Sequence, residues 1–189
     1  DALYVGVGED WYYSTLQAAL DDAKEGSKII ILAGEYNENV TISLANLTIV
    51  GPNAGTNPNT FAREEEAVLT GVITVLASAN NFTMDGLSFT KGAKIVGSEN
   101  KEYHNFKFVN NLVYDTNAST TDWVINRYVM KGFVEFNLPS GGSTNHFYFA
   151  NNRFTNVSDV NLLINRVVNL SVEGNVFLDF DRDAIRCEG

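Results

Sequence analysis

The sequence predicts an all-β protein, a right-handed parallel β-helix (a solenoid of short strands) with an N-terminal capping helix. A segment of about 23 residues recurs along the chain, with longer gaps after its first and third copies, and a period in this range is typical of solenoids. The chain has 23 asparagines and 15 glycines but only 3 prolines. This composition indicates many tight turns, because Asn and Gly tolerate positive φ. The apolar run Lys28–Leu32 has the length and composition of a strand buried on both faces of a parallel sheet.

The capping helix is expected within residues 13–26. Ser14 to Gln17 matches a capping box, and four apolar residues follow on one helical face before Gly26: Leu16, Ala19, Leu20 and Ala23. No second helical pattern follows. With 189 residues, the chain is expected to form a single domain, with β-helical coils from residue 28 onward.

The repeat predicts where the coils turn. Its five copies begin at Asn46, Asn81, Asn105, His146 and Asn169, and the later copies contain two short alternating strands around a Gly/Asn corner. In stacked coils each strand pairs with the next at ~4.8 Å, so inward apolar residues stack and inward asparagines form ladders. Leucine-rich repeats share the period but need a leucine framework that is missing here. His104 and His146 are expected to be turn residues.

Three insertions are expected as loops: Thr56–Glu66, Lys91–Glu102 and Pro139–Thr144. Loops on one side of a solenoid often carry its function. The last segment, Asp183–Gly189, resembles the start of another coil. We therefore expect this chain to be a piece of a longer protein, because an uncovered solenoid end exposes strand edges.

Charge and composition exclude several classes of partner. The net charge of −10 disfavours nucleic acid and anionic lipid, which need a positive field. The chain contains neither a run of eighteen apolar residues nor a signal peptide at its start, so no membrane insertion is expected. We expect an exported protein, secreted or held at the cell surface (extracellular or periplasmic), whose signal peptide has already been removed. The single cysteine, Cys187, is expected to be a small core residue.

Three segments carry a resemblance to a known family: residues 13–20, 29–42 and 47–51. Together they resemble the opening of pectin methylesterases and other pectin-lyase-like proteins, in which the helix caps the first coil. The catalytic motifs of that family are not found. These are the Gly-x-x-Asp-Phe-Ile-Phe-Gly and Gly-Arg-Pro-Trp segments of the esterases, the Trp-Ile-Asp-His motif of pectate lyases, and the Asn-x-Asp, Gly-His-Gly and Arg-Ile-Lys motifs of polygalacturonases. The resemblance therefore implies the fold and leaves the activity open.

The candidate ligand-binding residues come from an Asp/Arg pattern that repeats near the C-terminus. They are Asp122, Trp123, Arg127, Asp159, Arg166, Arg182, Asp183 and Arg186. Stacked coils are expected to align these side chains over ~10 Å, the span of three rungs. Arginine forks and carboxylates beside an aromatic face suit a sugar acid or a sulfated glycan. The alternative is a surface ladder of salt bridges between neighbouring coils.

No cofactor and no metal site is predicted. Asp179, Asp181 and Asp183 alternate, so an extended strand would point all three to one side, as Ca²⁺ ligands require. The alternative is a solvated charged turn, since the glycine-containing loop of an EF-hand is missing. Two histidines without a cysteine cluster are too few for zinc.

Three functions remain open. The leading hypothesis is an extracellular glycan-binding or adhesion module, which the missing catalytic motifs favour. The first alternative is a polysaccharide lyase or hydrolase acting on acidic glycans, with Arg127 or Arg166 as base or charge stabiliser beside Asp122 or Asp159. The second is a structural spacer of a surface protein. An enzyme predicts a groove with converging Asp and Arg, a binding module predicts exposed aromatics beside polar groups, and a spacer predicts neither.

Overall fold

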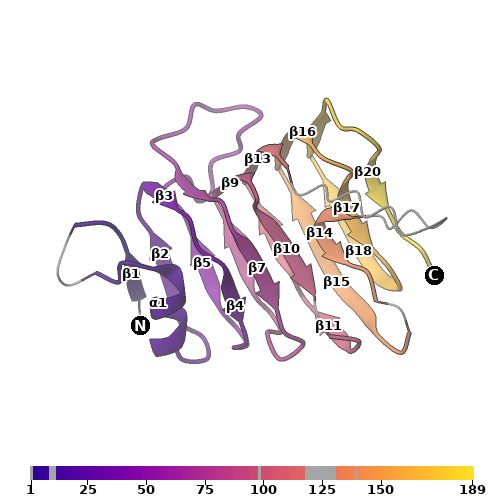
Figure 1. Ribbon diagram of the computed structural model, residues 1–189, viewed down its shortest axis with the longest axis horizontal. Helices are drawn as coiled ribbons and strands as arrows, with labels where there is room; N and C mark the ends of the chain where they lie inside the picture. The colour runs from indigo at the N-terminus through magenta and orange to yellow at the C-terminus, as the bar shows by residue number, and fades with distance from the viewer. Residues whose placement is uncertain (1, 9–11, 98, 118–130, 139) are drawn as a thin grey trace.

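Three parallel sheets wind into a β-helix in this computed structural model, which describes residues 2–8, 12–97, 99–117, 131–138 and 140–189 (Figure 1). Sheet A contains β1 (Ala2–Val5), β2 (Lys28–Ile31), β5 (Thr48–Val50), β8 (Thr83–Asp85), β11 (Glu102–His104), β12 (Lys107–Val109), β15 (Ser143–Ala150) and β18 (Val167–Glu173). Sheet B contains β3 (Gly34–Tyr36), β6 (Ala67–Leu69), β9 (Ser88–Lys91), β13 (Leu112–Thr116), β16 (Arg153–Val157) and β19 (Val176–Leu178). Sheet C contains β4 (Val40–Ile42), β7 (Val72–Val75), β10 (Lys94–Gly97), β14 (Gly132–Phe136), β17 (Val160–Ile164) and β20 (Asp183–Arg186).

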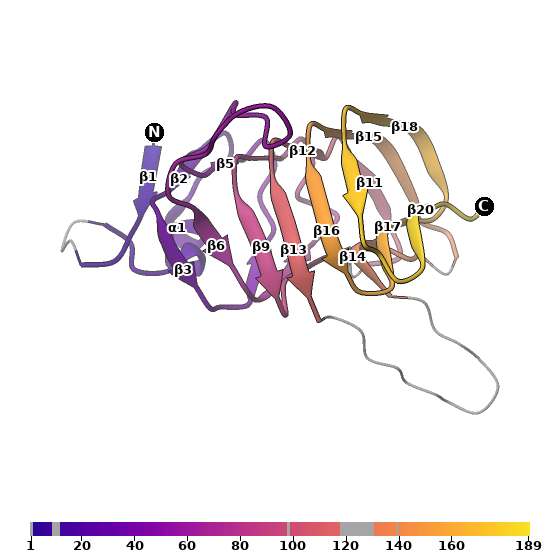
Figure 2. The same ribbon diagram turned by 90° about the horizontal axis from the view of Figure 1, so that it is seen from above.

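From β2 onward the strands enter the sheets in the order A, B, C, and one coil contributes two strands to sheet A, β11 and β12, which both pair with β15. Neighbouring strands in a sheet therefore come from successive coils, as Figure 2 shows for β9, β13 and β16. Every strand pair among the described residues is parallel. The predicted all-β right-handed parallel β-helix is confirmed.

One short helix, α1 (Leu16–Asp22), covers the N-terminal end of the coils. Its N-cap is Thr15, so it is shorter than the predicted 13–26 segment. The carboxylate of Glu38 accepts hydrogen bonds from the backbone N–H groups of Leu16 (2.6 Å) and Gln17 (3.1 Å), which fixes where the first turn begins. The amide oxygen of Gln17 accepts from the N–H of Thr41 at 2.8 Å. The helix thus pairs part of the free edge of β4, while Leu16, Ala19 and Leu20 are buried as predicted.

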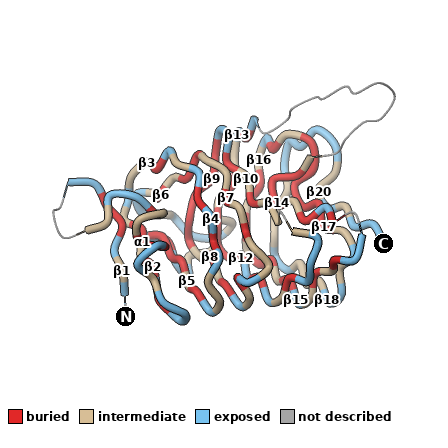
Figure 3. The backbone as a smooth tube through the Cα atoms, turned by 60° about the horizontal axis from the view of Figure 1, so that its bottom comes forward, coloured by how far each residue is buried: buried red, intermediate tan, exposed pale blue. Residues whose placement is uncertain are grey.

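Buried residues recur in successive coils along the β-helix (Figure 3), and their apolar side chains form one hydrophobic core. One column of sheet A runs in strict register through Ile29, Ile49, Met84, Phe108, Phe149 and Val172. Phenylalanines also stack between coils: the rings of Phe154 and Phe177 lie 4.8 Å apart at 9°, and those of Phe82 and Phe106 lie 4.3 Å apart at 12°. Each buried side chain of this size stabilises the fold by about 1.5–3 kcal/mol.

An inner asparagine ladder joins the coils at the corner between sheets A and B. The side-chain oxygen of Asn111 accepts from the N–H of Leu87 (2.8 Å), that of Asn152 from the N–H of Asn111 (2.9 Å), and that of Asn175 from the N–H of Asn152 (2.9 Å). Their amide nitrogens donate to carbonyls one coil earlier, those of Met84, Phe108 and Phe149. The residue before each of these corner positions has a positive φ: Gly86, Asn110, Asn151 and Gly174. The predicted inward asparagine ladder is confirmed.

An outer ladder lies where each coil enters sheet A. The first residue of every repeat copy adopts a φ between 57° and 60°: Asn46, Asn81, Asn105, His146 and Asn169. The Asn81 amide donates to Asn46 at 3.0 Å, and Asn105 donates to Asn81. Asparagine is favoured here because its short polar side chain tolerates the left-handed region. His146 shares this φ but lies within β15, and His104 lies within β11, so the prediction that both are turn residues was wrong. Strand pairing continues on both sides of His146 and includes His104 itself.

Residues 51–66 form the long loop expected around Thr56–Glu66, and it arches over the corner between sheets A and B (Figure 1). The Arg63 guanidinium donates to the carbonyl of Asn110 at 2.8 Å and forms an ion pair with Glu66 at 2.6 Å. The Asn59 amide donates to the carbonyls of Asn152 (3.2 Å) and Gly174 (3.3 Å). The loop therefore contacts several later coils.

The predictions of the other two loop insertions were wrong in part. The segment Lys91–Glu102 contains β10, because Ile95 and Val96 pair with β7 and continue sheet C. In the segment Pro139–Thr144, β15 begins at Ser143, which pairs with Glu102. Pro139 itself lies outside the described residues. Cys187 is exposed, so its prediction as a core residue was wrong: it follows β20, which pairs with β17 on one side only in the described part of the chain.

We expect Asn152→Ala to lower the free energy of unfolding by roughly 2–4 kcal/mol, because the buried N–H of Asn111 and the carbonyl of Phe108 both lose their partners. Urea unfolding measures this loss. Asn37→Ala is the matched control: Asn37 is exposed, and its loss is expected to stay within about 0.5 kcal/mol. Equal losses in the two variants would contradict the role of the ladder.

We expect Arg63→Met to release the 51–66 loop, with a loss of roughly 3 kcal/mol, because it leaves Glu66 unpaired and removes bonds to three backbone carbonyls. Limited proteolysis followed by mass spectrometry should then find cleavage between residues 51 and 66. Arg153→Met removes the same charge from a side chain with no ion pair among the described residues, and it should leave the loop protected. Protection of the loop in Arg63→Met would rule out this anchoring role.

Candidate functional site

Four of the predicted ligand residues cluster where the last two coils enter sheet C. Asp159 is buried and accepts from the N–H of Lys131 at 2.8 Å. Arg182 Nε lies 3.6 Å from Asp183 and 4.0 Å from Asp159. Arg186 pairs with Asp183 at 3.3 Å and with Glu188 at 2.7 Å. The pKa of Arg186 is raised, first by the hydrogen bond to Glu188 and then by the one to Asp183.

The other predicted residues do not join this cluster. Asp122, Trp123 and Arg127 lie outside the described residues. Arg166 is exposed at the opposite end of β17 from Asp159, where its N–H donates to the carbonyl of Glu188 at 2.7 Å. Asp159 and Arg166 therefore do not face one another.

The expected column of stacked Asp and Arg residues does not form in the last two coils. Asp183 pairs with Val160, and Arg186 pairs with Leu163, so neither lies in register with Asp159 or Arg166. Strands of the last two coils pair at a constant separation of 23 residues, from Arg153 with Val176 in sheet B to Val160 with Asp183 in sheet C. The position that matches Asp159 is therefore Arg182, and Asp183 lies one residue out of phase with Asp159.

The charges at this corner largely neutralise one another. Arg182 and Arg186 both contact carboxylates, but at this corner only the pair of Arg182 with Asp159 joins two described coils, so the alternative of a salt-bridge ladder is met by a single pair. Asp179 and Asp181 are exposed, while Asp183 faces two arginines. No group of three or more His, Cys, Asp or Glu side chains suited to a metal ion occurs within the described ranges.

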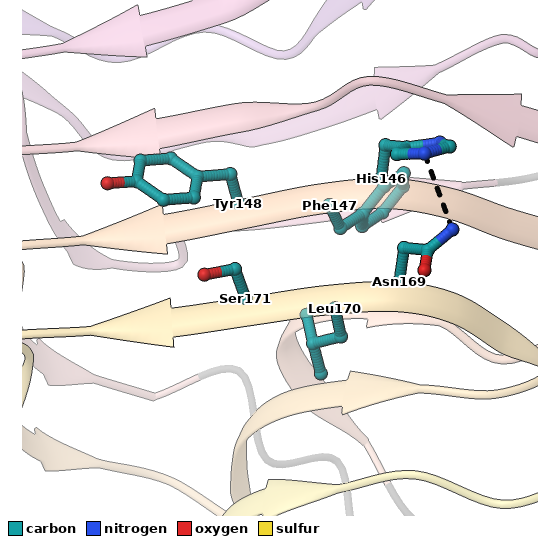
Figure 4. Close-up of a pocket in the computed structure, with 6 residues that line it drawn as sticks. All are labelled: His146, Phe147, Tyr148, Asn169, Leu170 and Ser171. Carbon is teal, nitrogen blue, oxygen red and sulfur yellow. Dashed lines mark hydrogen bonds between the residues drawn. The ribbon is translucent and has the colours of Figure 1, made fainter.

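A second candidate surface lies on the outer face of sheet A. A hollow of about 390 Å³ is lined by His146, Phe147, Tyr148, Asn169, Leu170 and Ser171 (Figure 4). Because side chains alternate along a strand, the polar members face outward from β15 and β18, while Phe147 and Leu170 face the core. The hollow therefore presents an imidazole, a phenol, an amide and a hydroxyl to solvent.

His146 takes the place of an asparagine in the outer ladder. Its Nε2 lies 3.3 Å from the side-chain nitrogen of Asn169 on the next coil (Figure 4). With the Asn169 amide as donor, Nε2 acts as the acceptor, which leaves Nδ1 as the position of the neutral ring's proton. The ladder geometry thus holds the imidazole at the rim of the hollow.

Lys107 supplies a positive charge next to the hollow. It pairs in register with Tyr148, which pairs with Ser171, so an ammonium, a phenol ring and a hydroxyl occupy consecutive coils. The ammonium lies 5.8 Å from the centre of the Tyr148 ring, within range of a cation–π contact. Lys107 is exposed and has no carboxylate within 4.0 Å in the described part of the chain. Its charge is therefore available to a ligand.

The hollow has the features of a binding surface rather than of a catalytic centre. The phenol of Tyr148 and the imidazole of His146 are directed away from one another (Figure 4). General acid–base catalysis requires groups that converge on one reacting atom. Aromatic, amide and cationic groups side by side instead suit stacking and hydrogen bonding to a sugar.

The sequence reasoning missed Lys107, Tyr148 and Ser171, and it identified His146 only as a turn residue. A usable signal was present, since each of these three residues lies two positions after the first residue of a repeat copy. Residues spaced by two on a strand share a face. The repeat phase therefore placed them in one outward column.

Comparisons with known proteins identify the fold. No family model matches the chain, and no curated protein matches it. Two solved structures are similar: a PL6 alginate lyase in complex with a trisaccharide (TM-score 0.58, 22% identity, 88% of this chain and 32% of that one) and the alginate lyase AlyF-OU02 with G6 (TM-score 0.58, 21% identity, 96% and 33%). The chain thus spans about a third of the length of either. At this identity the likeness establishes the β-helical fold alone.

No helix among the described residues is long and apolar enough to cross a membrane.

We expect His146→Asn to leave the melting temperature within about 1 °C of the parent, because asparagine adopts the same positive φ and continues the ladder. His146→Val should lower stability by about 1–2 kcal/mol, since a β-branched residue is strained at a φ of 57°. Thermal unfolding followed by circular dichroism compares the two. Similar melting temperatures for both variants would contradict the backbone requirement at this position.

Proposed function

We propose that this β-helix binds a polysaccharide on the outer face of sheet A. The observation that carries the proposal is the hollow of His146, Tyr148, Asn169 and Ser171, with the exposed Lys107 beside the Tyr148 ring. Sugar rings stack on aromatic faces, and their hydroxyls bond to amides, hydroxyls and imidazoles. These groups lie in outward columns that cross several coils, a geometry suited to an extended polymer.

The two similar solved structures support a carbohydrate partner, since both are complexes of alginate lyases with oligosaccharides. We propose a carbohydrate partner for the present chain as well. A polysaccharide of the extracellular space or the periplasm would require export, so we also propose that the protein is secreted or held at the cell surface.

The structural-spacer hypothesis accounts less well for this face. A spacer needs only groups that join neighbouring coils, as the ion pair of Arg182 with Asp159 does. Lys107 forms no ion pair in the described part of the chain, and it lies exposed beside an aromatic ring. The pectin-lyase-like resemblance of residues 13–51 agrees with a role in polysaccharide recognition but adds no binding residue to it.

A second candidate function is a polysaccharide lyase acting on an acidic glycan. The observation that favours it is the likeness to two alginate lyases. The pairing of Arg166 with Asp159 that the sequence suggested for such chemistry is disfavoured, because β17 separates the two side chains. A lyase would need a base and a group that stabilises the developing anion, both converging on the sugar.

We expect the parent chain to bind alginate oligosaccharides and Tyr148→Ala to bind them at least tenfold more weakly, about 1.4 kcal/mol, because the stacking surface is removed. Isothermal titration calorimetry measures the affinity. Tyr114→Ala is the matched control, since Tyr114 lies on sheet B and should leave binding unchanged.

Absence of binding by the parent, or unchanged binding by Tyr148→Ala, would reject the proposed surface. Ultraviolet absorbance recorded on the same samples detects unsaturated sugar products. Their appearance would move the assignment to the lyase.

A further inference from the structure

We propose that the outer face of sheet A carries a second subsite, formed by Lys28 and Tyr4, and that one acidic polysaccharide chain spans this subsite and the hollow. The second subsite rests on the proposed function, since the hollow is the other end of the same site. Three features of the face support it: the register of its outward side chains, the position of the 51–66 loop and the distribution of charge.

An outward column of hydrogen-bonding side chains connects the hollow to β2. Each member pairs in register with the next: Lys28, Thr48, Thr83, Lys107, Tyr148 and Ser171. All of them are exposed or half-buried. Adjacent strands are ~4.8 Å apart, so the column is ~24 Å long from Lys28 to Ser171. Figure 1 shows β2, β5, β15 and β18 in this order along the long axis, so a polymer on the column would follow the axis of the β-helix.

The 51–66 loop covers one side of this column. Two residues further along the strands, a second outward set pairs in register: Val50, Asp85, Val109 and Ala150. Its apolar members are at most 8% exposed. The Asp85 carboxylate accepts from the N–H of Gly55 in the loop at 3.0 Å and from the side chain of Asn110 at 2.8 Å. A ligand is therefore confined to the column and to the residues on its other side.

The outer ladder flanks the column on that other side. Its members precede those of the column by two positions and are all exposed: Asn46, Asn81, Asn105, His146 and Asn169. Side-chain amides both donate and accept hydrogen bonds, as sugar hydroxyls do. Polar groups suited to a sugar polymer therefore continue without a break from the hollow to β5.

The chemistry of the hollow recurs at the β2 end of the column. The register of β1 with β2 places Tyr4 diagonally across from Lys28 on the outward face. The Tyr4 ring is 38% exposed and lies 5.7 Å from the ring of Tyr12. Diagonal neighbours on adjacent strands are within reach of aromatic and long side chains. An ammonium and an aromatic ring thus adjoin there, as Lys107 and Tyr148 do beside the hollow.

Charge favours an acidic ligand that extends from the hollow toward β2. Lys28 and Lys107 are exposed, and neither forms an ion pair with a described residue. Three strand spacings, ~14 Å, separate them along the column. On the opposite side of the hollow, the Ser171 hydroxyl donates to the carboxylate of Glu173, which places a negative charge there. An acidic chain held at Tyr148 is therefore attracted toward Lys107 and Lys28.

Alginate oligosaccharides of increasing length test this span. In the parent chain, affinity measured by isothermal titration calorimetry should rise until the ligand reaches ~24 Å and then level off, because a long ligand engages both subsites at once. Lys28→Gln should bind the longest ligands about threefold more weakly and a trisaccharide as the parent does. Lys28→Arg keeps the charge and should retain the parent affinity.

Lys91→Gln is the matched control, since it removes the same charge from an exposed side chain on sheet B and should leave binding unchanged at every length. Thr48→Glu and Thr48→Gln differ only in charge at one position of the column. The Glu variant should bind the longest ligands about fivefold more weakly than the Gln variant. Thermal unfolding of all variants separates these effects from loss of the fold.

The outcomes distinguish the second subsite from the proposed function. Affinity that is independent of length and unchanged in Lys28→Gln, yet reduced in Tyr148→Ala, would overturn the second subsite and leave the proposed function in place. Absence of binding by the parent chain would reject both. Equal affinity for carboxyl-reduced alginate, which is neutral, would overturn the assignment to an acidic polysaccharide.

Discussion

The rest of the structure depends on lateral hydrogen bonding between successive coils in one fixed register. In a solenoid each coil contacts only its neighbours, so a slip of one residue would move every inward side chain to the outside. The corners prevent that slip. Asn111 and Asn152 each join three coils, because the side-chain amide bonds to the preceding coil and the backbone N–H bonds to the following one. The positive φ of the residue before them allows only a few residue types. The abundance of asparagine in this chain therefore has a structural cause.

Fixed register also explains why functional groups can be arranged in columns. Lys107, Tyr148 and Ser171 come from three coils but share one outward position of sheet A. The same constraint works against the predicted Asp/Arg column. There the coils repeat every 23 residues, whereas Asp159 and Asp183 are 24 residues apart, so Arg182 rather than Asp183 lies beside Asp159. A difference of one residue between a sequence pattern and the coil length thus decides which side chains meet.

The fold could be predicted from the sequence because repeat period, turn residues and strand composition all indicate the same architecture. The apolar face of α1 and the inward asparagine ladder follow from local rules. The hollow of sheet A could not be predicted in this way, since it depends on which repeat positions lie side by side across coils. Likewise, the extent of α1 is set by Glu38, a residue distant in sequence. The prediction for Cys187 was wrong because residue type alone does not show whether a neighbouring coil covers the side chain.

The 51–66 loop changes how such a chain can fold. Through Asn59 the loop bonds to Asn152 and Gly174, which lie 93 and 115 positions later in the sequence. Strand pairing, in contrast, joins only neighbouring coils. Contacts of such long sequence separation carry a loop-closure cost and form late, after the coils that hold both partners are in place. A solenoid without such a contact can lose its end coils one at a time. In this protein the loop couples the second coil to the fifth and sixth, so that opening of the last coils and release of the loop become a single cooperative event.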